Sequence, residues 1–314
     1  MTRAVVIAGG LSHEREVSLR SGRRLLDALR TSGVEAELHD ADVTLLPLLT
    51  EDPPDAVVIA LHGAPGEDGS LRGVLDLCGV PYVGGDARAA RLAWDKPSAK
   101  AVLRDRGIPT PDWVALPHER FSELGAAAVM DRIVGHLDTP LMVKPAQGGS
   151  GLGAAVVTDA AGLPAAMVGC FAYDHTALVE RHISGMDVAV SVVDLGDGPR
   201  ALPAVEIVPN SGVYDYAARY TAGLTTWHTP ARLSSKVTDR VAATALDAHR
   251  ALGLRDLSRV DLIVDEAGEP QVLEVTVTPG MTETSLLPMA LQAAGMDLGD
   301  VFTRLVAWAA QRGG

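Results

Sequence analysis

Two runs of β-branched residues in the last quarter of the chain interleave apolar and polar positions. The runs are Arg259–Asp265 and Gln271–Thr278, and a turn that contains glycine and proline joins them. This pattern predicts an antiparallel hairpin. Because side chains of a strand alternate between its two faces, polar groups from both runs fall on one face. These polar groups are Arg259, Asp261, Glu274 and Thr276.

The N-terminal segment alternates short apolar runs with a helical pattern. We expect a strand at Ala4–Ala8, a helix after Ser12 and a second strand at Ala56–Leu61. This order is typical of a parallel sheet, whose ligands lie beyond the carboxyl ends of the strands. The rule places Glu14 and His62 at the ligand-binding edge, although a histidine after a strand is more often structural.

The middle of the chain contains a glycine-rich loop between two predicted strands. A helical stretch, Ala87–Arg106, comes first and carries Lys96 before Pro97, where a proline can restart a helix. The strands 141–144 and 154–158 then flank the loop. Its backbone N–H groups can surround phosphate oxygens, and the alternative is a mobile loop without a ligand. It is not a Walker loop, because its lysine precedes the glycines.

The rest of the chain predicts further strands, a polar and aromatic loop, and two helical regions. The loop, Pro209–Trp227, holds three tyrosines and an arginine. Such a loop indicates either a functional lid or a packed irregular segment. The predicted strands are Ala177–Ile183, Asp187–Leu195 and Ala201–Val208, and the predicted helical regions are Ser234–Gly253 and Leu287–Arg312.

The carboxylates of the predicted hairpin are candidate metal ligands. Asp261 and Glu274 supply the oxygen atoms that Mg²⁺ prefers, and Arg259 suits the anionic groups that a metal attracts. The alternative is a half-solvated sheet face. Pro279 and Gly280 favour the metal site, because they end the strand and turn backbone N–H groups toward the acids.

Composition excludes several classes of protein. The chain has 314 residues, 47% hydrophobic and 21% charged, with a net charge of −13. This balance argues against binding to nucleic acid or to an anionic membrane. Two distant cysteines fit reduced thiols, and the apolar run at the N-terminus is too short for a signal peptide, so we expect a cytoplasmic protein.

Several motifs resemble the D-alanine–D-alanine ligases of the ATP-grasp superfamily. The glycine-rich loop follows V-K-P and contains G-S-x-x-G, as in the ATP-grasp flap. The other matching segments are S-x-E-R-E-V-S-L at Ser12–Leu19, A-L-H-G-x-x-G-E-D-G at Ala60–Gly69, Y-D-Y-x-A-R-Y at Tyr214–Tyr220, R-V-D at Arg259–Asp261 and L-E-x-T-x-T-P-G-M-T-x-x-S-L at Leu273–Leu286.

The resemblance implies that ATP lies between two lobes, with Mg²⁺, or alternatively Mn²⁺, beside it. Lysines and an arginine are implied to contact phosphates, Glu180 the adenine and Asp187 the ribose. The residues implied to contact ATP are Lys96, Lys144, Glu180, Asp187, Tyr214 and Arg219. The residues implied to bind the metal are Asp261, Glu274 and Thr276.

The resemblance also implies a site for two amino acids. Glu14 would hold the amino group of the first, and His62 would lie beside its carboxylate. Ser285 and the Leu286 N–H would bind the second carboxylate. Residues implied to act in catalysis or lid closure are Glu14, Ser150, Tyr220, Arg259, Gly280 and Ser285.

The chain departs from the family pattern at four positions. It has Thr276 where asparagine is usual and Gly151 where a second serine is usual, while Asp187 replaces glutamate and Arg219 replaces lysine. The leading hypothesis is ligation of two D-alanines for peptidoglycan synthesis and the cell wall. The alternatives are ligation of other amino acids in a biosynthetic pathway and a nucleotide-binding relative without turnover.

The implied fold is an ATP-grasp fold, α/β and α+β, with an N-terminal parallel-sheet domain. We expect domains at residues 1–86, 87–184 and 185–314, where the last two enclose ATP. The expected partners are small molecules, D-amino acids and ATP, and the resemblance suggests a homodimer.

Overall fold

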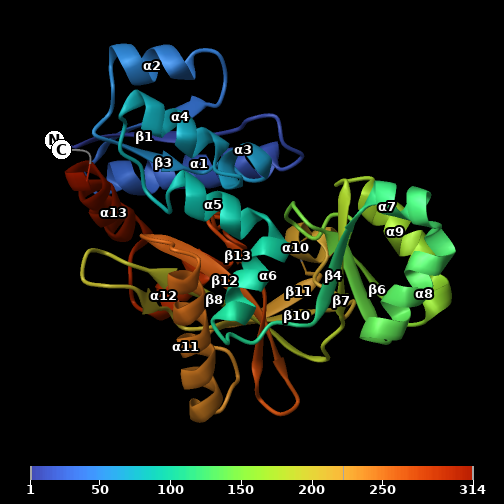
Figure 1. The fold of residues 1–314 in the computed structure, drawn as a ribbon. Coiled ribbons are helices and arrows are strands. Elements are labelled where there is room, and N and C mark those ends of the chain that lie inside the picture. The colour runs from blue at the N-terminus through green and yellow to red at the C-terminus, as the bar shows by residue number, and fades with distance from the viewer. Residues whose placement is uncertain (1, 222, 313–314) are drawn as a thin grey trace.

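Three β-sheets form the framework of the molecule (Figure 1). This computed structural model describes residues 2–221 and 223–312, and the side chain of Tyr220 lies outside the description. The 3-stranded N-terminal sheet is parallel, whereas the 4-stranded central sheet and the 6-stranded C-terminal sheet are antiparallel. The predicted combination of a parallel sheet with antiparallel sheets is therefore confirmed.

The N-terminal sheet has the strand order β2-β1-β3, and the apolar residues Ala4–Ala8 of its central strand are buried. β2 was not predicted, because its sequence E-A-E-L-H-D has few residues with high β-propensity. The elements of this part are β1 (Arg3–Ala8), α1 (Arg15–Thr31), β2 (Glu35–Asp40), α2 (Leu45–Glu51), β3 (Ala56–Ile59), α3 (Ala64–Glu67) and α4 (Ser70–Cys78).

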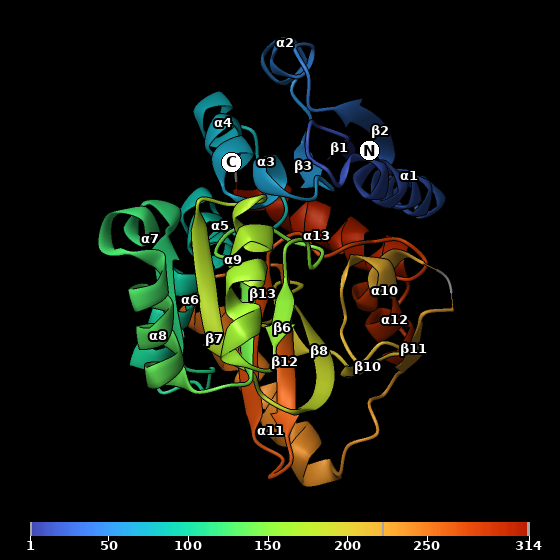
Figure 2. The ribbon, with the colours of Figure 1, turned by 90° about the vertical axis from the view of Figure 1, so that its right-hand side faces the viewer.

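The central sheet has the order β4-β7-β5-β6, and its helices cover the outer face (Figures 1 and 2). β5 and β6 form the predicted hairpin around the glycine-rich loop. The elements are β4 (Trp113–Pro117), α7 (His118–Leu124), α8 (Ala126–Leu137), β5 (Leu141–Pro145), β6 (Ala155–Val157), η1 (Ala160–Gly162), α9 (Leu163–Phe171) and β7 (Thr176–Arg181).

The C-terminal sheet has the order β11-β10-β8-β12-β13, with β9 paired to β8. β12 and β13 form the predicted hairpin, in which Arg259 faces Thr276 and Asp261 faces Glu274. The elements are β8 (Gly185–Val193), β9 (Arg200–Ala201), β10 (Val205–Pro209), α10 (Tyr216–Tyr220), β11 (Thr225–His228), α11 (Ser235–Ala251), β12 (Leu257–Asp265), β13 (Pro270–Thr276), α12 (Leu286–Ala293) and α13 (Leu298–Arg312).

Proline and glycine divide two segments of predicted secondary structure. The single strand expected at Ala201–Val208 is wrong: Pro203 lies between β9 and β10 and has no N–H to donate to a ladder. The helical region expected at Leu287–Arg312 consists of two helices, because Gly295 has a φ of +68° between α12 and α13. The loop Pro209–Trp227 contains α10 and ends in β11, so it is more ordered than expected.

Packed cores run across the expected domain bounds in two places. Asp86 caps α5 (Ala87–Trp94) at the first expected bound, and α6 (Lys96–Asp105) follows directly. Both helices share a core with α11, β12 and β13 rather than with the central sheet. Similarly, α13 packs against α1 of the N-terminal part (Figure 2). The domain bounds at 86 and 184 stay a prediction. The packing joins α5 and α6 to the C-terminal part, and α13 to the N-terminal part.

No helix within the described part of the chain combines the length and the apolar character needed to cross a membrane.

Candidate functional site

Two adjoining cavities lie where the three sheets approach one another. The first cavity lies between the N-terminal part and the β12–β13 hairpin, and Glu14, His62 and Ser285 are among its lining residues. The second lies between the central and C-terminal sheets, and Lys144 and Glu180 are among its lining residues. The cavities share a wall made of Lys96, Gly148, Gly149, Tyr214, Arg219 and Glu274.

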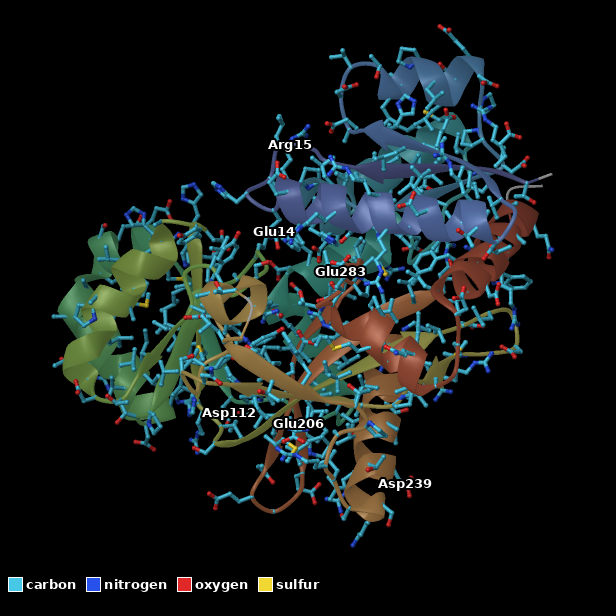
Figure 3. All side chains as sticks on the ribbon, turned by 180° about the vertical axis from the view of Figure 1, so that it is seen from behind. Glu14, Arg15, Asp112, Glu206, Asp239 and Glu283 are labelled. Atoms are coloured by element: carbon cyan, nitrogen blue, oxygen red, sulfur yellow. The ribbon has the colours of Figure 1, made fainter. Side chains whose placement is uncertain are left out.

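The glycine-rich loop reaches across the first cavity to the N-terminal part. Glu14 precedes α1 and faces the central sheet (Figure 3), and the Ser150 hydroxyl donates a hydrogen bond to its carboxylate. Both side chains are buried. Gly151 has a φ of +70°, and a Cβ there would lie 3.1 Å from the Cα of Asp215. Glycine at 151 therefore suits the close approach of the loop to the segment before α10.

His62 is held as a neutral imidazole in the first cavity. Its Nε2 lies 2.9 Å from the Ser21 hydroxyl, which accepts a hydrogen bond from the Met281 N–H. Ser21 is therefore free to donate its own proton to Nε2, which makes Nδ1 the protonated nitrogen. Burial and the charge of Arg259 lower the pKa of His62 to about 4.

Glu67 also lines the first cavity, and the sequence analysis did not single it out. Its carboxylate accepts a hydrogen bond from the Gly63 N–H at 3.0 Å. Burial and the neighbouring Glu14 raise the pKa of Glu67 to about 8. The available signal was its place in the segment A-L-H-G-x-x-G-E-D-G at Ala60–Gly69, of which only the histidine was named.

Arg72 is a second residue that the sequence analysis missed. It is 1% exposed and donates to the Gly66 and Gly85 carbonyls and to the Thr278 hydroxyl. These contacts fix the loop before α4 against the segment after β13. The arginine therefore sets the shape of the first cavity without lining it.

The polar face of the β12–β13 hairpin gathers charge at the junction of the cavities. The Arg259 guanidinium donates to both oxygens of Asp261, at 2.7 and 2.8 Å, and to the Thr276 hydroxyl at 3.1 Å. The Lys96 Nζ lies 3.7 Å from a Glu274 oxygen. Burial alone would raise the pKa of Glu274, but the surrounding cations lower it to about 2.

The turn after β13 completes the first cavity. A Cβ at Gly280 would lie 2.7 Å from the Ser285 hydroxyl oxygen, so a larger residue there would displace that hydroxyl. That hydroxyl accepts a hydrogen bond from the Thr282 N–H at 2.9 Å and lies 2.8 Å from the Thr282 hydroxyl. Ser285 precedes α12, which begins at Leu286, so the helix N-terminus faces the cavity.

The second cavity contains a buried carboxylate between two lysines. Glu180 contacts Lys144 Nζ with one oxygen and Lys100 Nζ with the other, both at 2.8 Å. Burial would raise the pKa of Glu180, but the two lysines lower it. Asp187 lies nearby, and burial raises its pKa to about 6.

The segment Pro209–Trp227, predicted as a lid or a packed segment, contributes Tyr214 and Arg219 to the shared wall of the cavities. The Arg219 guanidinium lies 4.3 Å from the centre of the Tyr214 ring, and its Nε donates to the Tyr214 carbonyl at 3.2 Å. Asp215 caps α10 by accepting from the Ala218 N–H. The predicted role of Tyr220 concerns a side chain outside the described residues.

The structure brings the other predicted site residues together around the two cavities. One group lines the first cavity: Glu14, His62, Ser150, Arg259, Thr276, Gly280, Ser285 and Leu286. A second group lines the second cavity: Lys144, Glu180, Asp187 and Asp261. The remaining residues line both: Lys96, Tyr214, Arg219 and Glu274. Their chemical roles stay predictions.

Comparisons with known proteins agree with this arrangement. The family described as "D-ala D-ala ligase C-terminus" matches residues 102–307. A D-alanine–D-alanine ligase from Pelotomaculum thermopropionicum is 38% identical over 96% of this chain and 94% of its own length. A D-alanine–D-alanine ligase from Bacillus anthracis, solved in complex with ATP, superimposes with a TM-score of 0.82 at 29% identity, covering 99% of this chain and 98% of that one.

A relative named for a different acceptor is similarly close in structure. The VanG D-Ala:D-Ser ligase from Enterococcus faecalis has a TM-score of 0.82 at 28% identity, and 98% of each chain is covered. The fold alone thus accommodates more than one named substrate pair. The family match over residues 102–307 and the full-length relative together show that this chain belongs to the D-alanine–D-alanine ligase family.

Proposed function

We propose that this protein joins two D-alanine molecules at the expense of ATP, through an acyl-phosphate intermediate, in peptidoglycan precursor synthesis. The observation that carries the proposal is the wall shared by the two cavities. Lys96, Arg219 and Glu274 line both, so a phosphate in the second cavity and a carboxylate in the first can meet there. Phosphoryl transfer needs such an arrangement of positive charge between aligned reactants.

The second cavity is the proposed ATP site. Lys96, Lys144 and Arg219 supply charge to the phosphates, where negative charge spreads during transfer. Glu180 and the backbone around it face the adenine. Asp187 faces the ribose, with a shorter side chain than the glutamate of the family pattern.

Asp261 and Glu274 fit a hard divalent cation, for which we propose Mg²⁺ with Mn²⁺ as an alternative. Each Asp261 oxygen accepts one N–H from Arg259 and keeps a second lone pair. Within the described residues no third acidic, histidine or cysteine side chain completes a cluster. The remaining ligands would come from phosphate and water, with the Thr276 hydroxyl oxygen as a weaker ligand. A bound Mg²⁺ offsets charge on phosphate oxygens.

The first cavity is the proposed site for both amino acids. Glu14 holds the ammonium group of the first, whose carboxylate lies beside His62. A carboxylate oxygen attacks the γ-phosphorus, ADP leaves, and an acyl phosphate forms. The amine of the second amino acid, placed by Ser285 and the Leu286 N–H, then attacks the acyl carbon.

The second step needs stabilisation of a tetrahedral oxyanion. Arg259 and the Gly280 N–H supply hydrogen-bond donors for it. Phosphate leaves with one former carboxylate oxygen. The ammonium of the second amino acid loses one proton before its amine attacks and a second proton as the amide forms. The flap residue Ser150, with the lid and Tyr220, keeps water away from the acyl phosphate.

A second candidate is the same reaction with another acceptor. The Thr282 hydroxyl lies in the corner where Ser285 meets the cavity, and Thr284 lies 3.4 Å from it. A polar acceptor side chain can hydrogen-bond to these hydroxyls, whereas D-alanine cannot. This observation favours testing hydroxylated amino acids beside D-alanine.

Release of ADP in the presence of single and paired D- and L-amino acids tests the proposal. With Mg²⁺ and ATP, we expect ADP to form rapidly with D-alanine alone, and slowly with L-alanine. Rapid turnover only with D-alanine and D-serine together would favour the second candidate. Absence of ADP with every amino acid tested would overturn both.

We also propose that the enzyme acts in the cytoplasm as a homodimer. Light scattering after size-exclusion chromatography tests the assembly. The expected mass is twice the 32.8 kDa of the chain, and the mass of a single chain would contradict the dimer.

A further inference from the structure

Lys100 and Lys144 contact the same buried carboxylate, that of Glu180. Lys144 does so from the second cavity, and Lys100 from outside its lining. Lys144 and Glu180 line the second cavity, whereas Lys100 is outside the described lining of either cavity. The two ammonium groups bind different oxygens of Glu180, each at 2.8 Å. The Glu180 and Lys100 side chains are 2% exposed and that of Lys144 is 12% exposed. A ligand in the cavity can therefore reach Lys144 and cannot displace Lys100.

Lys100 is fixed by Thr110, in the loop before β4, and by Trp113 of β4. Its Nζ donates to the Thr110 hydroxyl at 2.6 Å, which in turn donates to the Val272 carbonyl at 2.7 Å. The Trp113 ring lies 5.4 Å from the same Nζ. For Lys144, in contrast, the ion pair with Glu180 is the contact that the described structure shows. Lys100 is thus anchored, while Lys144 is free to turn toward the cavity.

We propose that Lys100 is a positioning residue that gives Glu180 a counter-charge held in place and so releases Lys144 to bind a nucleotide phosphate. The inference rests on the proposed function, because it requires ATP in the second cavity. A buried carboxylate without a cation is strongly unfavourable. If Lys144 were the sole partner of Glu180, its movement to a phosphate would leave such a carboxylate. Lys100 removes that cost because it stays in place.

The composition of the chain supports a special use of lysine here. The sequence contains four lysines among 27 basic residues, and three of them, Lys96, Lys100 and Lys144, surround the second cavity or its carboxylate. A lysine carries a compact charge on a flexible stem, which suits exchange between a carboxylate and a phosphate. The fourth, Lys236, is exposed on α11 and offers a matched control.

The experiment compares Lys100→Met with wild type in the binding of two ligands. We measure the dissociation constants of adenylyl imidodiphosphate with Mg²⁺ and of adenosine by calorimetry. Loss of one charge-assisted contact should weaken the first by about tenfold to a hundredfold. Adenosine has no phosphate, so its affinity should stay within about twofold, as should both affinities in Lys236→Met. An equal loss for both ligands in Lys100→Met, or no loss for either, would overturn the inference.

Two further variants, Glu180→Gln alone and Glu180→Gln combined with Lys100→Met, test whether Lys100 acts through the charge of Glu180. Glu180→Gln carries a neutral amide, so adding Lys100→Met to it should change the affinity for adenylyl imidodiphosphate by less than about twofold. Replacing both members of a buried pair also limits the risk of misfolding. A further loss as large as that of Lys100→Met alone would contradict the proposed role. If wild type binds neither ligand, the proposed function itself fails.

Discussion

The Ser150 hydroxyl donates a hydrogen bond to the Glu14 carboxylate, although 136 residues separate them in the chain. Ser150 belongs to the flap between β5 and β6, and Glu14 directly precedes α1, where Figure 3 labels it. The bond ties the flap to the first cavity, which Ser150 lines, whereas Ser150 does not line the second cavity. Its loss should therefore affect amino-acid use more than nucleotide binding.

Ser150→Ala should lower kcat/KM for the first amino acid by about tenfold, because one hydrogen bond to a charged group is lost. The affinity for adenylyl imidodiphosphate should change by less than about twofold. Steady-state kinetics and calorimetry measure the two quantities, with the exposed Ser235→Ala as control. Equal losses in both would show that the flap contact serves the nucleotide instead.

Tyr214→Leu should raise KM for ATP about threefold to fivefold, because Arg219 loses the ring that orients its guanidinium. Tyr214→Phe keeps the ring and should behave like wild type within about twofold. Initial rates at varied ATP measure the effect. If phenylalanine and leucine are equally harmful, the tyrosine hydroxyl rather than the ring is the important group.

Thr276→Asn should lower the Mg²⁺ concentration for half-maximal rate, because a carboxamide oxygen reaches further than a hydroxyl and is a better ligand. Thr276→Val is the control, since it removes the hydroxyl that accepts from Arg259 and should not lower the Mg²⁺ requirement. Rates over a Mg²⁺ titration make the comparison. An unchanged requirement combined with a different preferred amino acid would instead make Thr276 a specificity residue.

His249→Gln should make the protein less sensitive to acid. Burial lowers the pKa of His249 to about 4, and its Nδ1 lies 2.8 Å from the Ser258 hydroxyl. The folded pKa lies below the unfolded value of 6.5, so its contribution is present above pH 6.5 and is lost as pH falls toward 4. The lowering of this pKa from 6.5 to about 4 corresponds to about 3 kcal/mol of the free energy of unfolding.

Urea unfolding at pH 7 and pH 4.5 measures this effect. His62 has a similarly lowered pKa, so some loss of stability on acidification should remain in the variant. The exposed His136→Gln is the control and should decline as steeply as wild type. A decline in His249→Gln equal to that of wild type would remove His249 from the acid response.

Periodicity predicts contacts within one hairpin and does not predict contacts between distant segments. The two-residue period of strands placed Arg259, Asp261 and Glu274 on one face, which the register confirms. The proximity of Glu14 and Ser150 came only from the resemblance, because no local pattern joins two sheets. Once the family is known, the order of its motifs along the chain also indicates which residues line each cavity.

Buried charges were the main omission of the sequence analysis. Glu67, Arg72 and Lys100 were not singled out, since charged side chains usually face water. One signal was available for Lys100: it follows Lys96 by four positions, which puts both on one face of α6. The partners that make their burial tolerable come from other parts of the chain and could not be inferred from spacing.

The most direct test of the central claim follows the carboxylate oxygen of D-alanine. The protein is incubated with Mg²⁺, ATP and D-alanine labelled with ¹⁸O in its carboxylate, and the products are analysed by mass spectrometry. The account predicts one phosphate with one ¹⁸O atom for each ADP and each molecule of D-alanyl-D-alanine. Unlabelled phosphate, or ADP without the dipeptide, would contradict it.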